Sequence, residues 1–169
     1  MKQRTHYNTL FSKQTFPITL VCDNITNAPN IGSLFRTADA FGIRKIIFCG
    51  SPIPLGRKMT KTSRATEKVV PFEEKESILE TIKQLKVENY QIIALEITNN
   101  SLPIDSYIFP ENKKIALIIG DENFGVSEAV LNLSDTIIHI NMFGQNSSMN
   151  VVQATSIAFY EITKTAIKN

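Results

Sequence analysis

The chain has 169 residues, of which 43% are hydrophobic and 20% charged, and its formal net charge at pH 7 is +2. This length and composition predict a single globular domain over residues 1–169, with a substantial core and no second domain. A charge of +2 is too small to identify a polyanionic partner, so any nucleic-acid surface has to come from local clustering of cations.

The N-terminal residues 1–17 are interpreted as an extension of the domain. Its first residues have no apolar core like that of a signal peptide, and the chain nowhere has about 18 consecutive apolar residues. The two cysteines, Cys22 and Cys49, each lie in an apolar run and are expected to be buried free thiols. These features predict a cytoplasmic protein with no membrane contact.

The first half of the chain begins with two predicted strands on either side of a predicted helix. Residues 18–23 and 45–49 are short, β-branched and almost wholly apolar, as is typical of parallel strands buried on both faces. Between them lies a polar block, residues 27–42, in which residues 30–41 have helical spacing. Asn30 could cap this helix or belong to a site, and the sequence leaves both roles open.

A cluster of five cations follows the second predicted strand. It consists of Arg57, Lys58, Lys61, Arg64 and Lys68. The surrounding Gly, Ser and Thr residues predict a flexible basic loop, which could neutralise phosphates of a folded RNA. Because no aromatic residues are interleaved, the pattern favours contacts with the RNA backbone over base stacking. A solvated surface segment is the alternative.

The second half continues the alternation of strands and helices. The further predicted strands are residues 91–96, 115–119 and 136–140, and the further predicted helices are residues 75–88 and 150–167. A polar loop, residues 99–110, connects two of these strands. The whole pattern predicts an α/β fold with a mostly parallel central sheet flanked by helices.

Three polar blocks each follow a predicted strand. They are residues 27–42, 118–125 and 142–151. Because ligands of open α/β sheets collect beyond the carboxyl ends of the strands, these blocks predict one composite site.

The usual nucleotide and hydrolase fingerprints are missing from these blocks: G-x-G-x-x-G, the P-loop, H-E-x-x-H and G-x-S-x-G. No metal site is predicted either, because the two histidines, His6 and His139, lie far apart in sequence and no paired cysteine spacing occurs. His139 is interpreted as a strand-end residue rather than a base.

The three blocks resemble the three signature motifs of the SPOUT class of RNA methyltransferases, in particular the SpoU/TrmH branch, which methylates ribose 2′-hydroxyls. The matching residues are Asn30, Gly32 and Arg36 in the first motif, Gly120, Glu122 and Gly125 in the second, and Gly144, Ser148 and Asn150 in the third. The resemblance covers residues 21–161, which is nearly the whole chain.

The resemblance implies a C-terminal trefoil knot that binds S-adenosylmethionine. The catalytic residues that it implies are Arg36, Asn30, Glu122, Ser148 and Asn150. The cofactor-binding residues that it implies are Leu95, Ile119, Gly120, Gly125, Ile140, Met142, Gly144 and Met149. The RNA-binding residues that we expect are Arg57, Lys58, Lys61 and Arg64.

The residue types alone leave simpler roles open for several of these positions. The glycines could serve as turn residues, Glu122 could be a favourable acid near a helix start, and Ser148 and Asn150 could cap the last helix. Arg36 stays protonated in ordinary surroundings, so we expect it to clamp a phosphate and stabilise an alkoxide rather than to take up a proton.

The implied function is methyl transfer to a ribose 2′-hydroxyl of a structured RNA, with tRNA favoured over rRNA. A homodimer is a further implication. Many members of the family have a separate N-terminal RNA-binding domain, which we do not expect here. The alternatives are a base-methylating relative and a non-catalytic RNA-binding module. Three departures from the family pattern, Asn141, Met149 and Val152, bear on the cofactor loop and leave all proposed catalytic groups in place.

Overall fold

A computed structural model describes residue 9 and residues 11–167. Within these residues seven strands form one sheet, and helices cover both of its faces. The elements are β1 (Phe16–Asp23), α1 (Ala28–Ala40), β2 (Ile43–Cys49), α2 (Arg57–Ser63), η2 (Thr66–Lys68), β3 (Phe72–Lys75), α3 (Ile78–Val87), β4 (Tyr90–Leu95), β5 (Leu102–Pro103), β6 (Lys114–Ile119), α4 (Glu128–Leu133), β7 (Thr136–His139) and α5 (Val151–Ile167).

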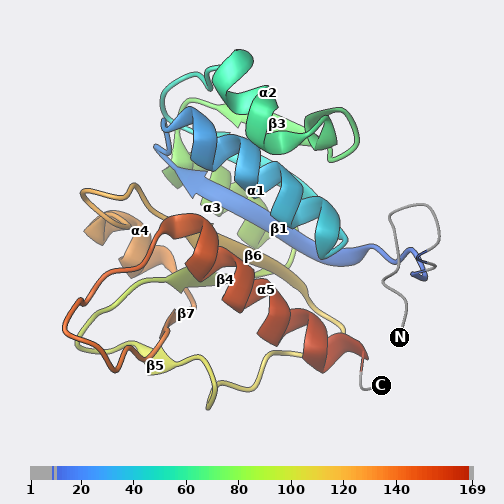
Figure 1. Ribbon diagram of the computed structural model, residues 1–169. Helices are drawn as coiled ribbons and strands as arrows, with labels where there is room; N and C mark the ends of the chain where they lie inside the picture. The colour runs from blue at the N-terminus through green and yellow to red at the C-terminus, as the bar shows by residue number, and fades with distance from the viewer. Residues whose placement is uncertain (1–8, 10, 168–169) are drawn as a thin grey trace.

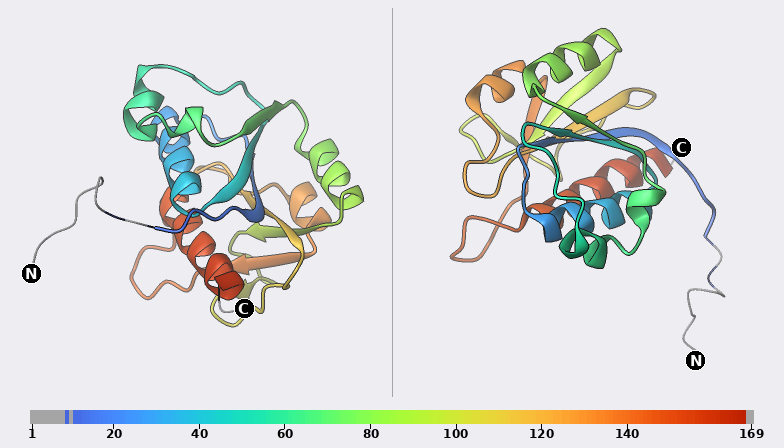
Figure 2. Two further views of the ribbon diagram at one scale, coloured as in Figure 1. Left: turned by 90° about the vertical axis from the view of Figure 1, so that its right-hand side faces the viewer. Right: turned by 90° about the horizontal axis from the view of Figure 1, so that it is seen from above.

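All strand pairs in the sheet are parallel, and the strand order is β3-β2-β1-β6-β4-β7-β5. The predicted α/β class with a parallel sheet is therefore confirmed. Figure 1 and the right-hand view of Figure 2 show α1 and α5 on one face of the sheet and α3 and α4 on the other. The trefoil knot implied by the family resemblance stays a prediction.

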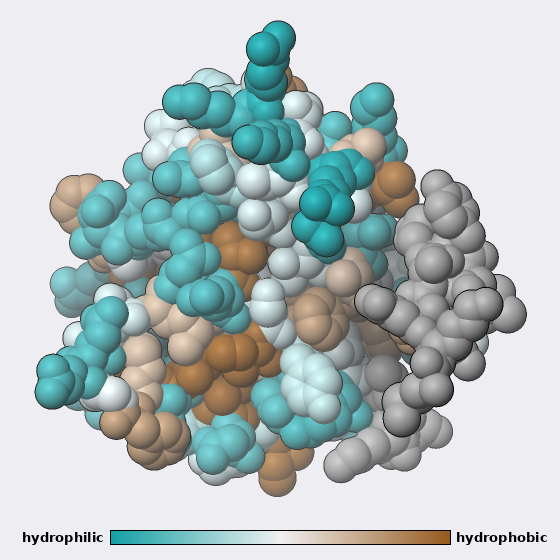
Figure 3. All heavy atoms as spheres, in the orientation of Figure 1, coloured by the Kyte–Doolittle hydropathy of each residue, from teal (hydrophilic) through white to brown (hydrophobic). Residues whose placement is uncertain are grey.

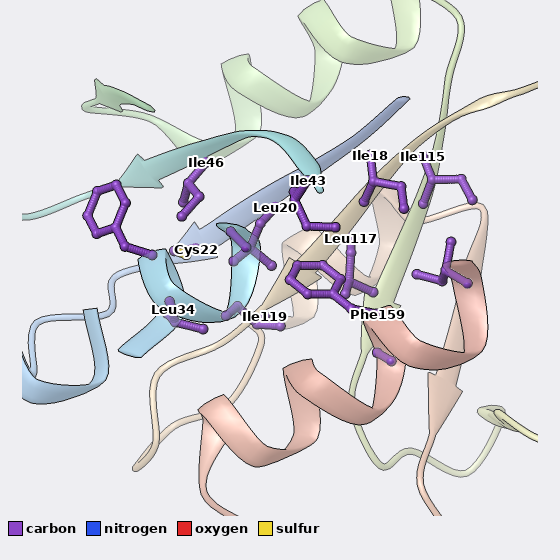
Figure 4. Close-up of a cluster of buried hydrophobic side chains, with 14 of the residues drawn as sticks. Ile18, Leu20, Cys22, Leu34, Ile43, Ile46, Ile115, Leu117, Ile119 and Phe159 are labelled. Atoms are coloured by element: carbon purple, nitrogen blue, oxygen red, sulfur yellow. The ribbon is translucent and has the colours of Figure 1, made fainter. Parts of the chain in front are cut away.

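The continuous apolar strands are explained by burial on both faces. In β1, Ile18, Leu20 and Cys22 pack toward α1 and α5, whereas Val21 belongs to the core under α3 and α4. Figure 4 shows the first of these cores, in which Leu34 of α1 and other helix side chains meet the central strands. Alternate residues thus point to opposite faces, and each face is apolar.

The prediction that the basic segment is a flexible loop is wrong, because most of the segment is helical. Most of its cations lie on α2, a short helix that begins after Gly56 and ends where Arg64 and Ala65 adopt left-handed backbone conformations with φ of 52° and 70°. Met59 is the only large apolar residue that this helix buries, which is too weak a pattern to predict it. Met59 and Ser63 face the protein, whereas the cations of the helix are exposed to solvent.

The close approach of α2 to α1 depends on a residue without a side chain. A Cβ atom at Gly32 would lie 2.1 Å from Oγ1 of Thr62 and 2.2 Å from the carbonyl oxygen of Met59. Gly32, which belongs to the first motif, therefore lets the backbones of the two helices pack together.

Two helices begin at different residues from those predicted. Helix α1 begins at Ala28, with Asn27 as its N-cap, so Asn30 is a helical residue and not the cap. Helix α3 begins at Ile78 after the N-cap Ser77, because the preceding residues form the edge strand β3, which was not predicted. The two-residue strand β5 and the short helix α4 were not predicted either.

Candidate active site

The carboxyl ends of three neighbouring strands, β4, β6 and β7, form one wall of a cavity of about 510 Å³. The loops that follow these strands lie together at the left-hand side of Figure 1. The start of α5 closes the cavity through Val151 and Ala154. A volume of this size lies within the range of small-molecule and cofactor sites.

The cavity gathers most of the residues that the sequence assigned to the cofactor. Its lining includes Leu95, Ile119, Gly120, Gly125, Ile140, Met142 and Met149. Gly144 is the exception: it does not line the cavity, and a Cβ atom there would have no neighbour within 4 Å. Of the residues assigned to catalysis, Glu122 and Ser148 line the cavity.

The glycines of the second motif are required by the shape of their own loop. A Cβ atom at Gly120 would lie 2.1 Å from the carbonyl carbon of Gly125, and Gly125 has φ of +66°. The turn is closed by the backbone N–H of Gly125, which donates to the carbonyl of Asp121 at 2.8 Å. These glycines are therefore turn residues, and the turn that they permit forms part of the cavity wall.

Glu122 joins the three motifs in space. Nδ2 of Asn30 donates to Oε1 of Glu122 at 2.6 Å, and Nδ2 of Asn150 donates to the same oxygen at 3.0 Å. The two asparagines also contact each other, since Nδ2 of Asn150 lies 3.3 Å from Oδ1 of Asn30. One carboxylate at the cavity therefore holds the first and third motifs together.

Asn150 caps α5 and also contacts Glu122, while its catalytic role stays a prediction. Its Oδ1 accepts a hydrogen bond from the backbone N–H of Val152 at 2.9 Å, which caps α5, while its Nδ2 reaches Glu122. Ser148 does not cap this helix. Its hydroxyl donates instead to Oδ1 of Asn146 at 3.1 Å.

Arg36 lies apart from this cluster. It is an exposed residue of α1, and it forms no hydrogen bond or ion pair through its side chain with any of the described residues. Six helical positions separate it from Asn30, which corresponds to about 9 Å along the axis and a rotation of about 240°. The structure therefore does not bring Arg36 together with the other residues assigned to catalysis.

Several cavity residues were not singled out from the sequence as site residues, among them Glu96 and His139, whose titratable side chains have defined hydrogen-bond partners. Glu96 follows β4, and its Oε2 accepts a hydrogen bond from the backbone N–H of Val126 at 2.9 Å. His139 ends β7, as its interpretation as a strand-end residue requires, but it also lines the cavity. Its Nδ1 lies 2.9 Å from Oγ of Ser101, and its Nε2 lies 3.2 Å from Oδ1 of Asn141.

The charges around the cavity are acidic. Glu96, Asp121 and Glu122 line it, whereas no lysine or arginine among the described residues does so. At the nearby end of β1, burial raises the pKa of the Asp23 carboxyl, the backbone N–H of Ser127 partly offsets this, and the negative charge of Asp121 raises it further. Such a site favours ligands that carry positive charge or hydrogen-bond donors.

The cations of α2 and of its C-cap Arg64 form a separate surface. Arg57, Lys58, Lys61 and Arg64 are all exposed, and Figure 3 shows hydrophilic side chains gathered over α2 at the top of the molecule. In the described part of the chain none of them forms an ion pair with an acidic residue. This surface is therefore free to meet an anionic partner.

Neither a metal centre nor a membrane span occurs within the described residues. No group of three or more His, Cys, Asp or Glu side chains is placed there to hold a metal ion, and no helix has the length and apolarity to cross a bilayer. His6 lies outside the described residues.

The parallel sheet and its carboxyl-edge cavity define an α/β protein with a cofactor-sized site, and comparison with known proteins gives its family. The model of the SpoU rRNA methylase family matches residues 17–160. The chain therefore belongs to this family, as the three motifs indicated.

Two relatives that are named as methyltransferases have longer chains than this protein. An uncharacterised tRNA/rRNA methyltransferase of Mycobacterium bovis is 28% identical over 85% of this chain and 51% of its own length. The 23S rRNA (guanosine-2′-O-)-methyltransferase RlmB of Blochmanniella floridana is 29% identical over 88% of this chain and 58% of its own. The chain thus spans little more than half the length of these relatives.

Solved structures share the fold at lower identity. The TrmH/SpoU tRNA modifying enzyme of A. aeolicus has a TM-score of 0.83, with 24% identity over 92% of this chain and 78% of its own. AviRb of Streptomyces viridochromogenes in complex with AdoMet has a TM-score of 0.81, with 22% identity over 100% and 67%. A structure described by 2-OH methylation of C/U34 on tRNA has a TM-score of 0.79, with 21% identity over 91% and 100%.

Proposed function

We propose that this chain transfers a methyl group from S-adenosylmethionine to a ribose 2′-hydroxyl of a structured RNA, with tRNA as the substrate class. The observation that carries the proposal is the position of Glu122, which lines the cavity and accepts hydrogen bonds from Asn30 and Asn150. Residues from all three motifs thereby meet at the edge of one cofactor-sized cavity.

The cavity fits S-adenosylmethionine in size and in chemistry. Apolar side chains such as Leu95, Ile119 and Ile140 suit an adenine ring, and the acidic lining suits a ligand that carries a sulfonium and an ammonium. When bound, this cofactor supplies an electrophilic methyl group. The cavity residues would hold it by backbone groups of the turn at Gly120 and by apolar contacts.

The reaction needs the 2′-oxygen to be oriented and its developing charge to be stabilised. We assign charge stabilisation and phosphate clamping to Arg36, because a guanidinium keeps its protons and can bind two anionic oxygens at once. The hydroxyl proton then needs another acceptor. We assign that role to Glu122, whose carboxylate the two asparagines hold in place, and substrate positioning to Ser148. The proposed reaction uses no metal ion.

The separation of Arg36 from Glu122 supports a homodimer in which a second copy completes the site. Helix α5 exposes the apolar side chains of Ile157 and Tyr160, which are 37% and 57% accessible, beside α1. Figure 3 shows exposed apolar side chains on the face where α5 lies. Pairing through this face would cover them and bring the partner's α1 near the cavity.

The exposed cations of α2 support contact with RNA phosphates. Arg57, Lys58 and Lys61 lie on an ordered helix packed on α1, and Arg64 is the C-cap of that helix, so their spacing is fixed before RNA binds. The choice of tRNA is supported by two structural neighbours whose descriptions name tRNA, one of them matched over its whole length. The proposed setting is the cytoplasm, where Cys22 and Cys49 would stay as the free, buried thiols that the structure contains.

The test is incubation of the purified chain and methyl-labelled S-adenosylmethionine with total tRNA and, separately, with rRNA, followed by nucleoside digestion and mass analysis. A 2′-O-methylated nucleoside from tRNA is the expected product. The same nucleoside from rRNA alone would contradict the substrate class, and a methylated base would move the chain to base methylation. No transfer to either RNA would favour the non-catalytic RNA-binding alternative.

A further inference from the structure

We propose that Glu96 is a cofactor-specificity residue whose carboxylate accepts hydrogen bonds from the vicinal ribose hydroxyls of the bound nucleoside. The inference rests on the proposed function, because it concerns the same cavity. It adds a residue that lies outside the three motifs.

Glu96 is placed where it can reach both the protein backbone and a ligand. It follows Leu95 at the carboxyl end of β4, and it lines the cavity together with Thr98. An acidic side chain shortly beyond a strand's carboxyl end is a recurrent acceptor for ribose hydroxyls in nucleotide-binding α/β sheets.

The carboxylate of Glu96 is fixed by the protein before any ligand binds. Oε2 accepts from the backbone N–H of Val126 at 2.9 Å, and Oε1 accepts from that of Ile97 at 3.0 Å. Gly125 makes the first contact possible, because a Cβ atom there would lie 2.4 Å from Oε2. The side chain therefore connects the exit of β4 to the loop after β6 in one defined position.

These two hydrogen bonds leave acceptor capacity on the same carboxylate. A carboxylate has about four lone-pair sites, and the two backbone amides use two of them. Within the described part of the chain, no lysine or arginine lines the cavity to occupy the other two. Two oxygens that are each half satisfied match two neighbouring hydroxyl donors, so the vicinal diol of a ribose fits this group.

The ammonium group of the cofactor is the other donor that Glu96 could bind. Ligands that lack either a ribose hydroxyl or the ammonium distinguish the two donors. The probes are S-adenosylhomocysteine, its 2′-deoxy and 3′-deoxy analogues, and 5′-methylthioadenosine, which keeps the diol but has no ammonium. Each is titrated into the wild type, Glu96→Gln, Glu96→Asp and the control Glu111→Gln by calorimetry. Glu111 is an exposed carboxylate that does not line this cavity.

The expected result is a loss of about 10-fold or more in affinity for each deoxy analogue in the wild type and in Glu111→Gln. In Glu96→Gln the deoxy analogues and their parent should bind within about threefold of one another, and 5′-methylthioadenosine should weaken as much as S-adenosylhomocysteine. Glu96→Asp, which withdraws the carboxylate by one methylene, should reduce the hydroxyl effect in the same direction.

Equal affinity of the wild type for the deoxy analogues and their parent would overturn the inference, and this comparison needs no variant to fold. A hydroxyl effect that persists in Glu96→Gln would also overturn it, leaving Glu96 as a residue that only fixes the backbone. If 5′-methylthioadenosine were insensitive to Glu96→Gln, the donor would be the ammonium. Failure of the wild type to bind any adenosine ligand would instead contradict the proposed function, and the inference with it.

Discussion

Asn30 donates a hydrogen bond from Nδ2 to Oε1 of Glu122 at 2.6 Å, although 92 positions separate the two residues in the chain. The contact joins the third helical position of α1 to the loop after β6, because β1 and β6 are neighbouring parallel strands whose carboxyl ends meet. Asn150 reaches the same oxygen from the N-cap of α5. The cluster therefore depends on the sheet order as much as on the motifs.

Replacement of the two asparagines at the start of α1 should separate site function from helix stability. Asn30→Ala removes one donor to Glu122 and should lower methyl-transfer kcat by about 10-fold, the lower end expected for a hydrogen bond to a charged group. Asn27→Ala removes the N-cap instead and should cost about 1 kcal/mol, which lowers Tm by about 2–4 °C. Turnover and thermal unfolding of both variants check this. The opposite assignment of the two effects would contradict the account.

Arg36→Ala should lower kcat by about 100-fold or more, because it removes the group that we assign to the developing charge on the 2′-oxygen. Affinity for S-adenosylhomocysteine should stay within about twofold, since Arg36 does not line the cavity. Arg44→Ala is the matched control, an exposed arginine on β2. Comparable losses of turnover and of cofactor affinity in Arg36→Ala would exclude the assigned role.

Neutralising α2 should weaken RNA binding and reduce its dependence on salt. The triple variant Arg57→Gln, Lys58→Gln, Lys61→Gln should flatten the slope of log affinity against log salt by about 0.7–0.9 for each phosphate that is no longer neutralised. A control triple variant, Arg44→Gln, Lys83→Gln, Lys113→Gln, makes the same change of charge elsewhere. Filter binding at several salt concentrations measures both slopes. An unchanged slope in the α2 variant would make α2 an ordinary solvated surface.

The strands that carry the site could be predicted because they are buried on both faces. Residues 18–23 and 115–119 are mostly or wholly apolar, and short runs of this kind are typical of strands covered by helices on both sides. Edge strand β3 has the sequence FEEK and is stabilised in part by an ion pair of 2.7 Å between Lys45 and Glu73. It therefore has no apolar pattern from which it could be predicted. Helices α2 and α4 bury too few side chains for their periodicity to be visible.

The motif residues could be identified because their spacing in the sequence is recognisable. Glu96 and His139 belong to no such pattern. Asn30, Glu122 and Asn150 occupy positions with a recognisable spacing, and their convergence then follows from the parallel sheet. The position of Glu96 is created by a hydrogen bond with the backbone of Val126, 30 residues further along the chain, and no spacing rule encodes that hydrogen bond. The isolation of Arg36 likewise depends on the rotation of α1 and has no signature in the sequence.

Asp23→Asn should stabilise the protein at neutral pH and leave its stability unchanged in acid. Burial and Asp121 raise the pKa of the Asp23 carboxyl above its ordinary value of 3.8, so the folded state binds this proton more tightly than the unfolded state. Stability is therefore lost as pH rises from that ordinary value through the raised one. Asn keeps an oxygen acceptor for the N–H of Ser127 but carries no charge.

Thermal unfolding of the wild type and Asp23→Asn from pH 3 to pH 7 measures this difference. The variant should have the higher Tm at pH 7, and the two curves should converge as the pH falls below about 4. A Tm difference that stays constant over this range would show that the effect does not arise from titration of Asp23.

The most direct measurement of the central claim compares two synthetic RNAs that differ at one atom. Once the modified nucleotide has been located, a substrate with its natural ribose is compared with one that has a 2′-deoxyribose at that position, using labelled S-adenosylmethionine. Our account predicts that transfer to the deoxy substrate falls to background while its binding changes little. Undiminished transfer to the deoxy substrate would contradict ribose methylation and identify a base as the acceptor.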